Sequence, residues 1–290
     1  MSYYKVLGFE KEPFSTSPDP EFFYLSKEHE TALTNILIEL RLKRGLSVIL
    51  GDVGTGKTSL SRKLIQELRS RDDFIFNIVL DPSFENEALF LTSLAKDFEI
   101  INMGNGSGPT ILDLRDTLEG FLFQKGVTEN KIVVLIIDEA QKLSESSLEI
   151  LRVLLNYETN EFKLLQLVLL GQLELHSTIM NISNFFDRIS FKYTLNPLGF
   201  DETREMVDFR IRQAGYRANM RLFLDDALRE IYQHSRGYPR QITMLCHKAL
   251  KYMVLKNRFV IDAALVRELV DEEIRTGWHR KDLLLQKNSY

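Results

Sequence analysis

The sequence predicts an α/β fold in which helices cover a parallel sheet. Short apolar runs alternate with longer stretches of helical spacing, and this alternation is typical of such a sheet. Most of the apolar runs are bounded by Gly, Asp or Pro, and their continuous hydrophobicity suits strands that are buried on both faces. The five predicted strands are Leu46 to Leu50, Phe74 to Leu80, Lys131 to Ile137, Leu164 to Leu170 and Phe191 to Leu195.

Helices of crossover length are predicted between these strands. The segment from Met103 to Pro109 is rich in glycine and is expected to be a loop. The predicted helices are Thr58 to Arg69, Glu85 to Phe98, Thr110 to Lys125, Ser146 to Tyr157 and a shorter one from about Glu174.

After Pro197 the strand pattern stops, and a separate helical domain is expected over residues 198–290. Its predicted helices are Glu202 to Ala214, Asp225 to His234, Pro239 to Lys256 and Asp262 to Arg275. In the third of these, one face carries Ile242, Leu245, Cys246, Ala249 and Met253 at helical spacing, so Cys246 is interpreted as a core residue and not as a reactive thiol.

The first 30 residues form a third segment, in which prolines punctuate several aromatic residues. This composition suggests an arm that packs on the α/β domain. The expected domains are therefore an arm over 1–30, an α/β domain over 31–197 and a helical domain over 198–290.

The composition excludes a disordered or fibrous protein and bears on location and partners. Hydrophobic residues are 44% and charged residues 27%, as in ordinary globular proteins. The net charge of -4 means that nucleic-acid binding would require a local basic surface. The single cysteine excludes an internal disulfide and favours a reducing compartment. No apolar run reaches the roughly 18–20 residues of a membrane span, and the N-terminus lacks a signal-peptide core, so a cytoplasmic location is expected.

A phosphate-binding motif lies between the first predicted strand and the helix that follows it. The sequence GDVGTGKT fits G-x-x-x-x-G-K-[ST], in which glycines let backbone N–H groups surround phosphates at a helix N-terminus. Lys57 is expected to reach the β- and γ-phosphates of ATP, and the Thr58 hydroxyl to bind Mg²⁺. The residues predicted to hold the nucleotide here are Gly51, Asp52, Val53, Gly54, Thr55, Gly56, Lys57, Thr58 and Ser59.

Two acids end the predicted strand from Lys131 to Ile137, as in a Walker B element. Asp138 is placed to hold magnesium, and Glu139 to orient a water for attack on the γ-phosphate. An acid that only caps the next helix is the alternative. The additional glutamate favours hydrolysis by an activated water over a simple nucleotide switch.

Two rival classes of phosphate-loop protein fit less well. A GTPase would carry an N-K-x-D guanine-binding motif, whereas Asn130-Lys131-Ile132-Val133 lacks the aspartate. A helicase could use Asp138-Glu139-Ala140-Gln141, but the chain is too short for a second motor domain.

Three further polar residues are candidates by position. Gln172 follows the strand that ends at Leu170, Arg188 precedes the last strand, and Arg240 opens a helix of the helical domain. A loop glutamine without a function and ordinary surface arginines are the alternatives.

Taken together, these motifs resemble the AAA+ superfamily and, within it, the ExeA (GspA-type) ATPases of the general secretion pathway. The resemblance extends over nearly the whole sequence. It is carried by Pro13-Phe14, Ser17-Pro18-Asp19-Pro20, Phe23-Tyr24-Leu25-Ser26 with His29, the GDVGTGKT loop, Ile137-Asp138-Glu139-Ala140-Gln141, Leu169-Leu170-Gly171-Gln172 and Gly237-Tyr238-Pro239-Arg240.

The resemblance implies a five-stranded parallel sheet in the order 5-1-4-3-2 and a helical lid from about residue 198. It also implies roles for the three candidates by position. Gln172 would be sensor 1, Arg240 would be sensor 2, and Arg188 would be a finger inserted into the site of a neighbouring subunit. Hydrolysis would then depend on a homo-oligomer, a ring or a filament.

Two partner classes follow from the resemblance. The first is a protein complex of an envelope or secretion system, whose assembly ATP hydrolysis would drive. The second is DNA, because related stand-alone ATPases similar to the TniB and MuB transposition regulators bind DNA and recruit a transposase. A module that binds nucleotide but barely hydrolyses it is a third possibility. Basic residues for DNA binding, or for a merely solvated face, are Arg204, Arg210, Arg212, Arg217, Arg221, Lys248, Lys251, Lys256 and Arg258.

Overall fold

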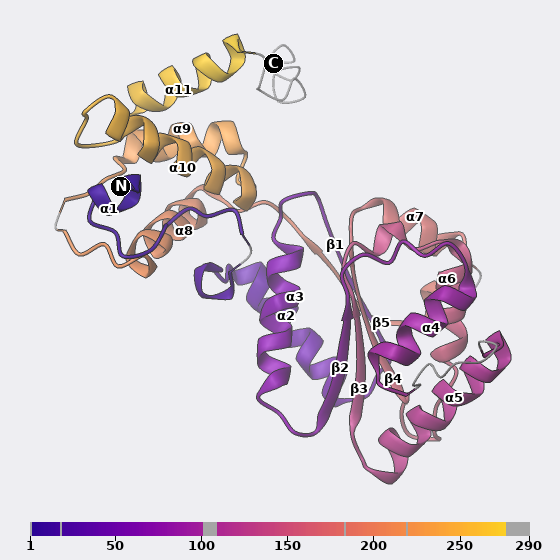
Figure 1. The fold of residues 1–290 in the computed structure, drawn as a ribbon. Helices are drawn as coiled ribbons and strands as arrows, with labels where there is room; N and C mark the ends of the chain where they lie inside the picture. Colours follow the sequence, from indigo (N-terminus) through magenta and orange to yellow (C-terminus); the bar gives the residue numbers. More distant parts are fainter. Residues whose placement is uncertain (1, 18, 101–108, 183, 219, 277–290) are drawn as a thin grey trace. The chain divides into compact units, whose positions relative to one another are not determined.

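A computed structural model describes residues 2–17, 19–100, 109–182, 184–218 and 220–276 (Figure 1). The glycine-rich loop expected from Met103 lies outside these residues up to its last position, Pro109. The chain forms two compact units. The first contains Lys27–Val53 and Lys57–Asn196, and the second contains Gly54–Gly56 with the described parts of Met1–Ser26 and Pro197–Tyr290.

The first unit contains the predicted sheet of five parallel strands. Its order is β2-β3-β4-β1-β5, which confirms the order implied by the resemblance. The strands are β1 (Leu46–Gly51), β2 (Phe74–Val79), β3 (Ile132–Ile137), β4 (Leu165–Gly171) and β5 (Ile189–Leu195).

Burial along the strands follows their position in the sheet. Every residue of β3 and β4 is buried, as expected for central strands covered on both faces. The edge strand β5 instead alternates between half-buried and exposed side chains up to Leu195. This alternation explains why β5 begins at Ile189, two residues before the predicted start at Phe191, since its first residues do not form an apolar run.

Helices cover both faces of this sheet (Figure 1). The helix α2 was not predicted, although its buried residues Ala32, Leu33, Ile36 and Leu40 follow helical spacing. The helices α2 (Lys27–Arg41) and α3 (Lys57–Arg69) lie on one face. On the other face lie α4 (Glu87–Asp97), α5 (Ile111–Phe123), α6 (Glu145–Leu154) and α7 (Glu174–Met180), with the short turns η2 (Gln124–Thr128) and η3 (Ala140–Lys142) in the same unit.

Side-chain caps set the first residue of several of these helices. The Asn86 side chain accepts the Leu89 N–H (2.9 Å) at the start of α4. Thr110 and Asp113 form a capping box before α5. These caps move the helix starts by one or two residues from the predicted positions, because a capping residue itself lies outside the helix.

The second unit contains the expected helices of the helical domain. The predicted buried face of its third helix is confirmed, since all five of its residues are buried. Burial also raises the pKa of the Cys246 thiol, which agrees with a core residue and an unreactive thiol. The helices are α8 (Phe200–Gln213), α9 (Asp225–Ser235), α10 (Pro239–Leu255) and α11 (Ala263–Arg275).

The N-terminal arm differs from its prediction, because it packs in the helical unit and not on the α/β domain. It contains the short helices α1 (Tyr3–Val6) and η1 (Pro20–Phe22). Phe9, Phe14 and Phe22 are buried in the same apolar cluster as the helices α8 to α11. The arm ends at Ser26, because the next residue begins α2 of the sheet unit.

A buried arginine explains why the arm belongs to the helical unit. The Arg210 guanidinium, on α8, donates hydrogen bonds to the carbonyl oxygens of Pro13 (2.8 Å) and Ser15 (2.8 Å). It also lies over the rings of Phe14 and Phe22, at 5.9 and 5.6 Å from their centroids. Burial lowers the pKa of Arg210 to about 10, so this arginine serves packing and is not a free surface cation.

Replacement of Phe14 by alanine tests this packing. Phe14 is fully buried, so Phe14→Ala is expected to lower the free energy of unfolding of the helical unit by about 3–5 kcal/mol. Urea denaturation followed by circular dichroism measures the change. As a control, Phe259→Ala removes a ring that is 80% exposed and should change stability by less than about 0.5 kcal/mol. Equal stabilities of the two variants would show that the arm is not packed.

Candidate functional site

The loop between β1 and α3 contains backbone conformations that only glycine adopts readily. Gly54 and Gly56 have φ angles of 89° and 100°, in the left-handed region that disfavours side chains. Successive turns of this kind form a concave nest of backbone N–H groups, which binds anions. The helix α3 begins immediately afterwards at Lys57, so the positive end of its dipole adds to the same region.

The other residues of the motif contribute mainly backbone. The Asp52 and Val53 side chains are exposed, Thr55 is buried, and Ser59 is partly buried in the first turn of α3. A backbone cradle explains this arrangement, because the motif specifies glycine and not the side chains at these positions.

Lys57 is a buried cation, only 5% exposed. Its amine donates hydrogen bonds to the carbonyl oxygens of Gly51 (2.7 Å) and Asp52 (2.9 Å). Burial lowers the pKa of Lys57, while the negative charges of Glu139 and Asp138 act in the opposite direction. A desolvated amine that bonds only neutral carbonyls would gain strongly from an anionic ligand, so this site fits a phosphate group.

Asp138 lies beside the start of α3, which brings the two predicted motifs together. Its carboxylate accepts a hydrogen bond from the Ser61 hydroxyl (3.4 Å) and one from the Glu139 N–H (3.0 Å). Burial raises the pKa of Asp138, and a hydrogen bond from Thr58 lowers it. The Thr58 hydroxyl and the Asp138 carboxylate are therefore neighbours, as expected for two ligands of one metal ion.

These two groups suit magnesium better than a metal held by a protein cage. Among the described residues, no cluster of three or more His, Cys, Asp or Glu side chains could hold a metal ion. Magnesium typically uses one or two protein oxygens, with water and phosphate oxygens completing its shell. Thr58 and Asp138 offer that set.

Glu139 is held in an unusual conformation by a residue whose role the sequence did not suggest. Its φ of 51° is left-handed, which is rare for a residue with a side chain and frequent at functional sites. The Gln141 amide donates to the Glu139 carboxylate (2.6 Å), and the Gln141 oxygen accepts the backbone N–H of Gln172 (3.0 Å). Gln141 thus links the ends of β3 and β4. Its two partners, the Glu139 carboxylate as acceptor and the Gln172 N–H as donor, became evident only from the fold.

Gln172 reaches this network through its backbone. It follows β4, which pairs with β1, the strand before the phosphate-binding loop. The observed contact uses the main-chain N–H and not the side-chain amide. The structure thus brings together Lys57, Thr58, Asp138, Glu139 and the backbone of Gln172.

Arg240 belongs to the helical unit, together with Gly54–Gly56. Its backbone N–H donates to the Gly54 carbonyl (3.3 Å), near the start of α10. Gly237, just before this helix, has a φ of 76°, and a Cβ there would lie 1.9 Å from the Leu198 carbonyl oxygen. Only glycine fits at this turn, which fixes the position of Arg240.

Arg188 is not near the other candidates in its own chain. It ends the short helix η4 (Phe186–Arg188), immediately before β5 begins. The strands are parallel, so Arg188 lies at the edge where they begin, whereas Asp138 and Gln172 follow the ends of β3 and β4. Its Nε atom is buried and has no hydrogen-bond partner within the described part of the chain.

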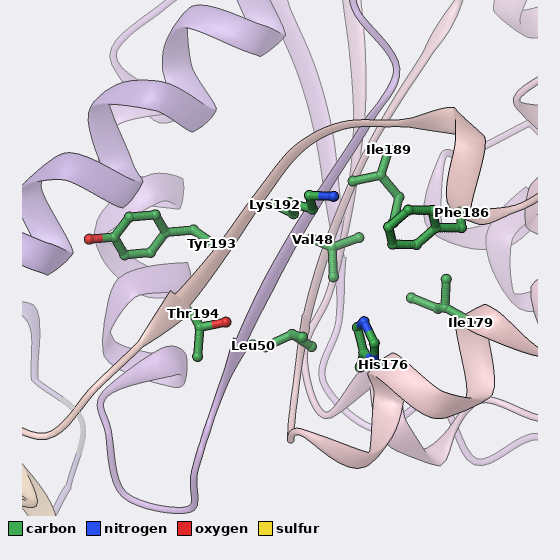
Figure 2. A pocket seen from close by; sticks show the side chains of 9 residues that line it. All are labelled: Val48, Leu50, His176, Ile179, Phe186, Ile189, Lys192, Tyr193 and Thr194. Atoms are coloured by element: carbon green, nitrogen blue, oxygen red, sulfur yellow. The ribbon is translucent and has the colours of Figure 1, made fainter.

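A cavity of about 260 Å³ lies beside the same helix η4 (Figure 2). Within it, the Lys192 amine lies 4.5 Å from the centroid of the Phe186 ring, which His176 contacts edge-on. These contacts fix Phe186, two residues before Arg188. The lining residues are Val48, Leu50, His176, Ile179, Phe186, Ile189, Lys192, Tyr193 and Thr194.

The fold and the loop define a phosphate-loop protein of the AAA class, and the AAA domain family matches residues 40–179. Two solved structures share the fold. Cdc6p from Pyrobaculum aerophilum has a TM-score of 0.68 and 18% identity, covering 90% of this chain and 70% of its own. The ORC2 protein from Aeropyrum pernix has a TM-score of 0.61 and 18% identity, covering 86% and 68%.

Sequence similarity extends beyond that domain. General secretion pathway protein A of Aeromonas hydrophila is 35% identical over 251 residues, which are 86% of this chain and 44% of the relative. The chain is therefore similar to the AAA proteins of the ExeA (GspA-like) type, and the resemblance seen in its motifs is confirmed. It spans less than half of the length of that relative. Among the described residues, no helix is long and apolar enough to cross a membrane.

Asp138→Asn is expected to stabilise the ligand-free protein by about 0.5–2 kcal/mol, because burial disfavours the ionised form of the wild-type carboxylate. Burial raises the folded-state pKa of Asp138 above its unfolded value. The free-energy cost of burying the charged Asp138 carboxylate is therefore fully present above its folded-state pKa. This cost disappears as the pH falls through the unfolded-state pKa, near 4.

Denaturant unfolding at about pH 7 and about pH 4 measures this difference, which should shrink at the lower pH. The exposed Asp116→Asn variant is the control and should show no such gain. A less stable Asp138→Asn protein would contradict the prediction.

Proposed function

We propose that this chain binds ATP with Mg²⁺ and hydrolyses it. The observation that carries the proposal is the meeting of a buried, carbonyl-bound Lys57 amine with two acids, Asp138 and Glu139, beside a glycine nest. A site that exists to stabilise the fold would pair Lys57 directly with a carboxylate. Here its amine bonds only carbonyls, an arrangement suited to a charged ligand.

Each residue has a distinct task in this proposal. The loop from Gly51 to Ser59 binds the phosphates with backbone N–H groups, and the Lys57 amine neutralises the β- and γ-phosphates. Thr58 and Asp138 hold the metal ion, which supplies charge neutralisation when it is bound. Glu139 orients the attacking water by accepting its proton.

Gln141 and Gln172 connect Glu139 to the rest of the sheet. The Gln141 amide holds the Glu139 carboxylate at 2.6 Å, and its oxygen is held by the Gln172 backbone. We infer that a displacement of the chain after β4 changes the orientation of Glu139. This link gives Gln172 a physical means to act as sensor 1.

The two arginines would complete the site in an assembly. Arg240 would reach the nucleotide from the helical unit as sensor 2, next to Gly54. Arg188 would act in the site of a neighbouring subunit. Two observations support this role: Arg188 lies at the strand ends opposite the phosphate-binding loop of its own chain, and its Nε atom has no hydrogen-bond partner among the described residues. The chain would then be a homo-oligomer when it is active.

The work of hydrolysis is proposed to be assembly or remodelling of a protein complex in the cytoplasm. The similarity to General secretion pathway protein A supports a partner in an envelope or secretion system. A pull-down with the ATP-locked Glu139→Gln variant tests this role. Recovery of no envelope-associated protein, together with ATP turnover that such proteins leave unchanged, would count against it.

Variants of Lys57 and Glu139 separate binding from turnover. Lys57→Ala is expected to weaken ATP binding, since the buried amine is removed. Glu139→Gln should keep ATP affinity within about threefold but lower kcat by about 10²-fold or more, because the amide cannot accept a proton. Calorimetry and phosphate release measure the two effects.

The Glu161→Gln variant serves as a control, since Glu161 is exposed and precedes β4, at the opposite strand ends from Asp138 and Glu139. Its turnover should match that of the wild type. Normal hydrolysis by Glu139→Gln would show that another group activates the water, and no ATP uptake by the wild type would end the proposal.

Arg188→Ala tests the contribution of a neighbouring subunit. ATP binding should stay intact while hydrolysis falls about 10³-fold, the usual effect of an arginine finger. Mixing Arg188→Ala with Glu139→Gln should restore part of the turnover, since a mixed assembly contains sites with both groups intact. Sizing with a non-hydrolysable ATP analogue checks that the assembly forms. Absence of rescue in a formed assembly would place Arg188 outside the neighbour's site.

A further inference from the structure

Basic residues gather where the first four strands begin. Parallel strands begin at one edge of the sheet, so the segments that precede them lie together there. We call this surface the basal rim and define it as residues 41–45, 69–73, 124–131 and 155–164, which precede β1, β2, β3 and β4. It lies at the opposite strand ends from Asp138 and Glu139.

Contacts between these segments make the rim one continuous surface. The Lys43 amine donates to the Asn130 side chain (3.3 Å), and the Lys163 N–H donates to the Lys43 carbonyl (3.1 Å). The Lys131 amine donates to the Asp72 carbonyl (2.6 Å). Four segments that are distant in sequence are therefore held side by side.

The rim has a net positive charge, although the chain as a whole has a charge of -4. It contains eight Lys and Arg residues against five Asp and Glu residues. Three of its cations form ion pairs within the rim, Arg41 with Asp73, Lys125 with Glu129 and Lys163 with Glu158. Among the described residues, five rim cations form no ion pair, namely Lys43, Arg44, Arg69, Arg71 and Lys131. The two rim acids outside the three pairs are Asp72 and Glu161.

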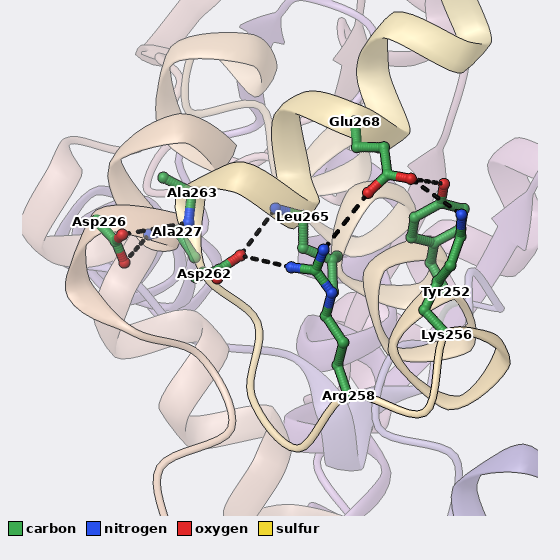
Figure 3. Close-up of polar contacts among 9 residues, drawn as sticks. All are labelled: Asp226, Ala227, Tyr252, Lys256, Arg258, Asp262, Ala263, Leu265 and Glu268. Carbon is green, nitrogen blue, oxygen red and sulfur yellow. Dashed lines mark hydrogen bonds and ion pairs between the residues drawn. The ribbon is translucent and has the colours of Figure 1, made fainter.

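The helical unit, where the sequence suggested a basic DNA surface, has a different charge distribution. Its described residues contain sixteen basic and sixteen acidic side chains. Lys256 and Arg258 share Glu268, and Arg258 also contacts Asp262 (Figure 3). Other candidates are neutralised in the same way: Arg204 by Asp201, Arg217 by Glu10, Arg221 by Asp225 and Lys248 by Glu273.

Lys43 occupies a position where folding alone would favour glycine. Its φ is 52°, at the end of α2, and the neighbouring Arg44 N–H closes the helix by donating to the Glu39 carbonyl (3.2 Å). Glycine adopts this helix-ending conformation without strain. Lys43 is half-buried, with its amine 4.0 Å from the centroid of the Phe162 ring, so the fold holds this cation at the rim in a strained conformation.

We propose that the basal rim binds the phosphate backbone of nucleic acid, with duplex DNA as its ligand. Phosphate contacts use Arg and Lys together with neutral donors, and Ser70, Thr128 and Asn130 lie exposed among the rim cations. A protein partner would instead need an apolar centre, whereas the large exposed apolar side chains of the rim, Leu42 and Val127, lie on different segments. The rim contains no residue of the nucleotide loop, so this proposal goes beyond ATP hydrolysis and does not depend on it.

Charge removal at two exposed rim positions tests the proposal. The wild type and Arg44→Gln/Arg69→Gln are titrated with a fluorescently labelled duplex of about 30 bp between about 50 and 200 mM salt. The double variant should bind about fivefold or more weakly at about 100 mM salt. Its slope of log K against log salt should be shallower by about 1.8, because each lost phosphate contact removes about 0.9.

The matched control removes two exposed, ion-paired arginines of the helical unit, Arg217→Gln/Arg221→Gln. This variant should keep the wild-type slope and affinity within about twofold. Lys43→Gly should fold at least as stably as the wild type in denaturant and yet bind DNA more weakly, which separates binding from stability.

Several outcomes would overturn the proposal. One is an unchanged slope for the rim variant, and another is the absence of salt-sensitive binding by the wild type. A third is rim-dependent binding of polyglutamate but not of the duplex, which would assign the rim to an acidic protein. ATP turnover of both double variants should equal that of the wild type. Failure of turnover in the wild type, with rim-dependent DNA binding intact, would reject the ATPase proposal alone.

Discussion

The desolvated ammonium group of Lys57 is the interaction on which the site depends. The sheet places apolar side chains along the strands and leaves polar groups at the strand ends, so a charge at the end of β1 is removed from most water. Hydrogen bonds to two carbonyl oxygens and the negative charges of Asp138 and Glu139 offset part of the free-energy cost of burying the ammonium group. The order of the strands supplies those acids, because only β4 separates β3 from β1 in the sheet.

The same arrangement leaves the ligand-free site less stable than its surroundings. Burial disfavours the ionised form of Asp138 and raises its pKa, and Glu139 has a left-handed backbone conformation. Gly54 and Gly56 have conformations that no other residue adopts without strain. A fold under selection for stability alone would remove these features, so their concentration at one edge of the sheet agrees with a ligand that relieves them.

The sequence alone predicted the features that depend on a fixed spacing of residues. The five strands, the loop from Gly51 to Thr58 and the acids after β3 follow from apolar runs and from one motif. Contacts between distant segments were not accessible in the same way. The prediction placed the arm on the wrong unit, because its aromatic rings indicate that it is buried but not against which helices. The contacts that decide this come from Arg210, nearly two hundred residues away. Gln141 was missed as a link for the same reason, since the Gln172 N–H that donates to its oxygen follows β4 and lies 31 residues away in the sequence.

Charge pairing is another property that the sequence does not reveal. The basic residues of the helical unit were counted as a candidate DNA surface, yet most of them face a carboxylate of the same unit. The cations of the rim attracted less notice, because they are dispersed over four loops and are assembled only by the parallel sheet. A parallel sheet thus separates two surfaces by strand polarity, with the nucleotide residues at the ends of its strands and the rim at their beginnings. β1 and β3 each run from the rim to the opposite edge and pair with a strand on either side, so both surfaces are built on the same strands of the sheet.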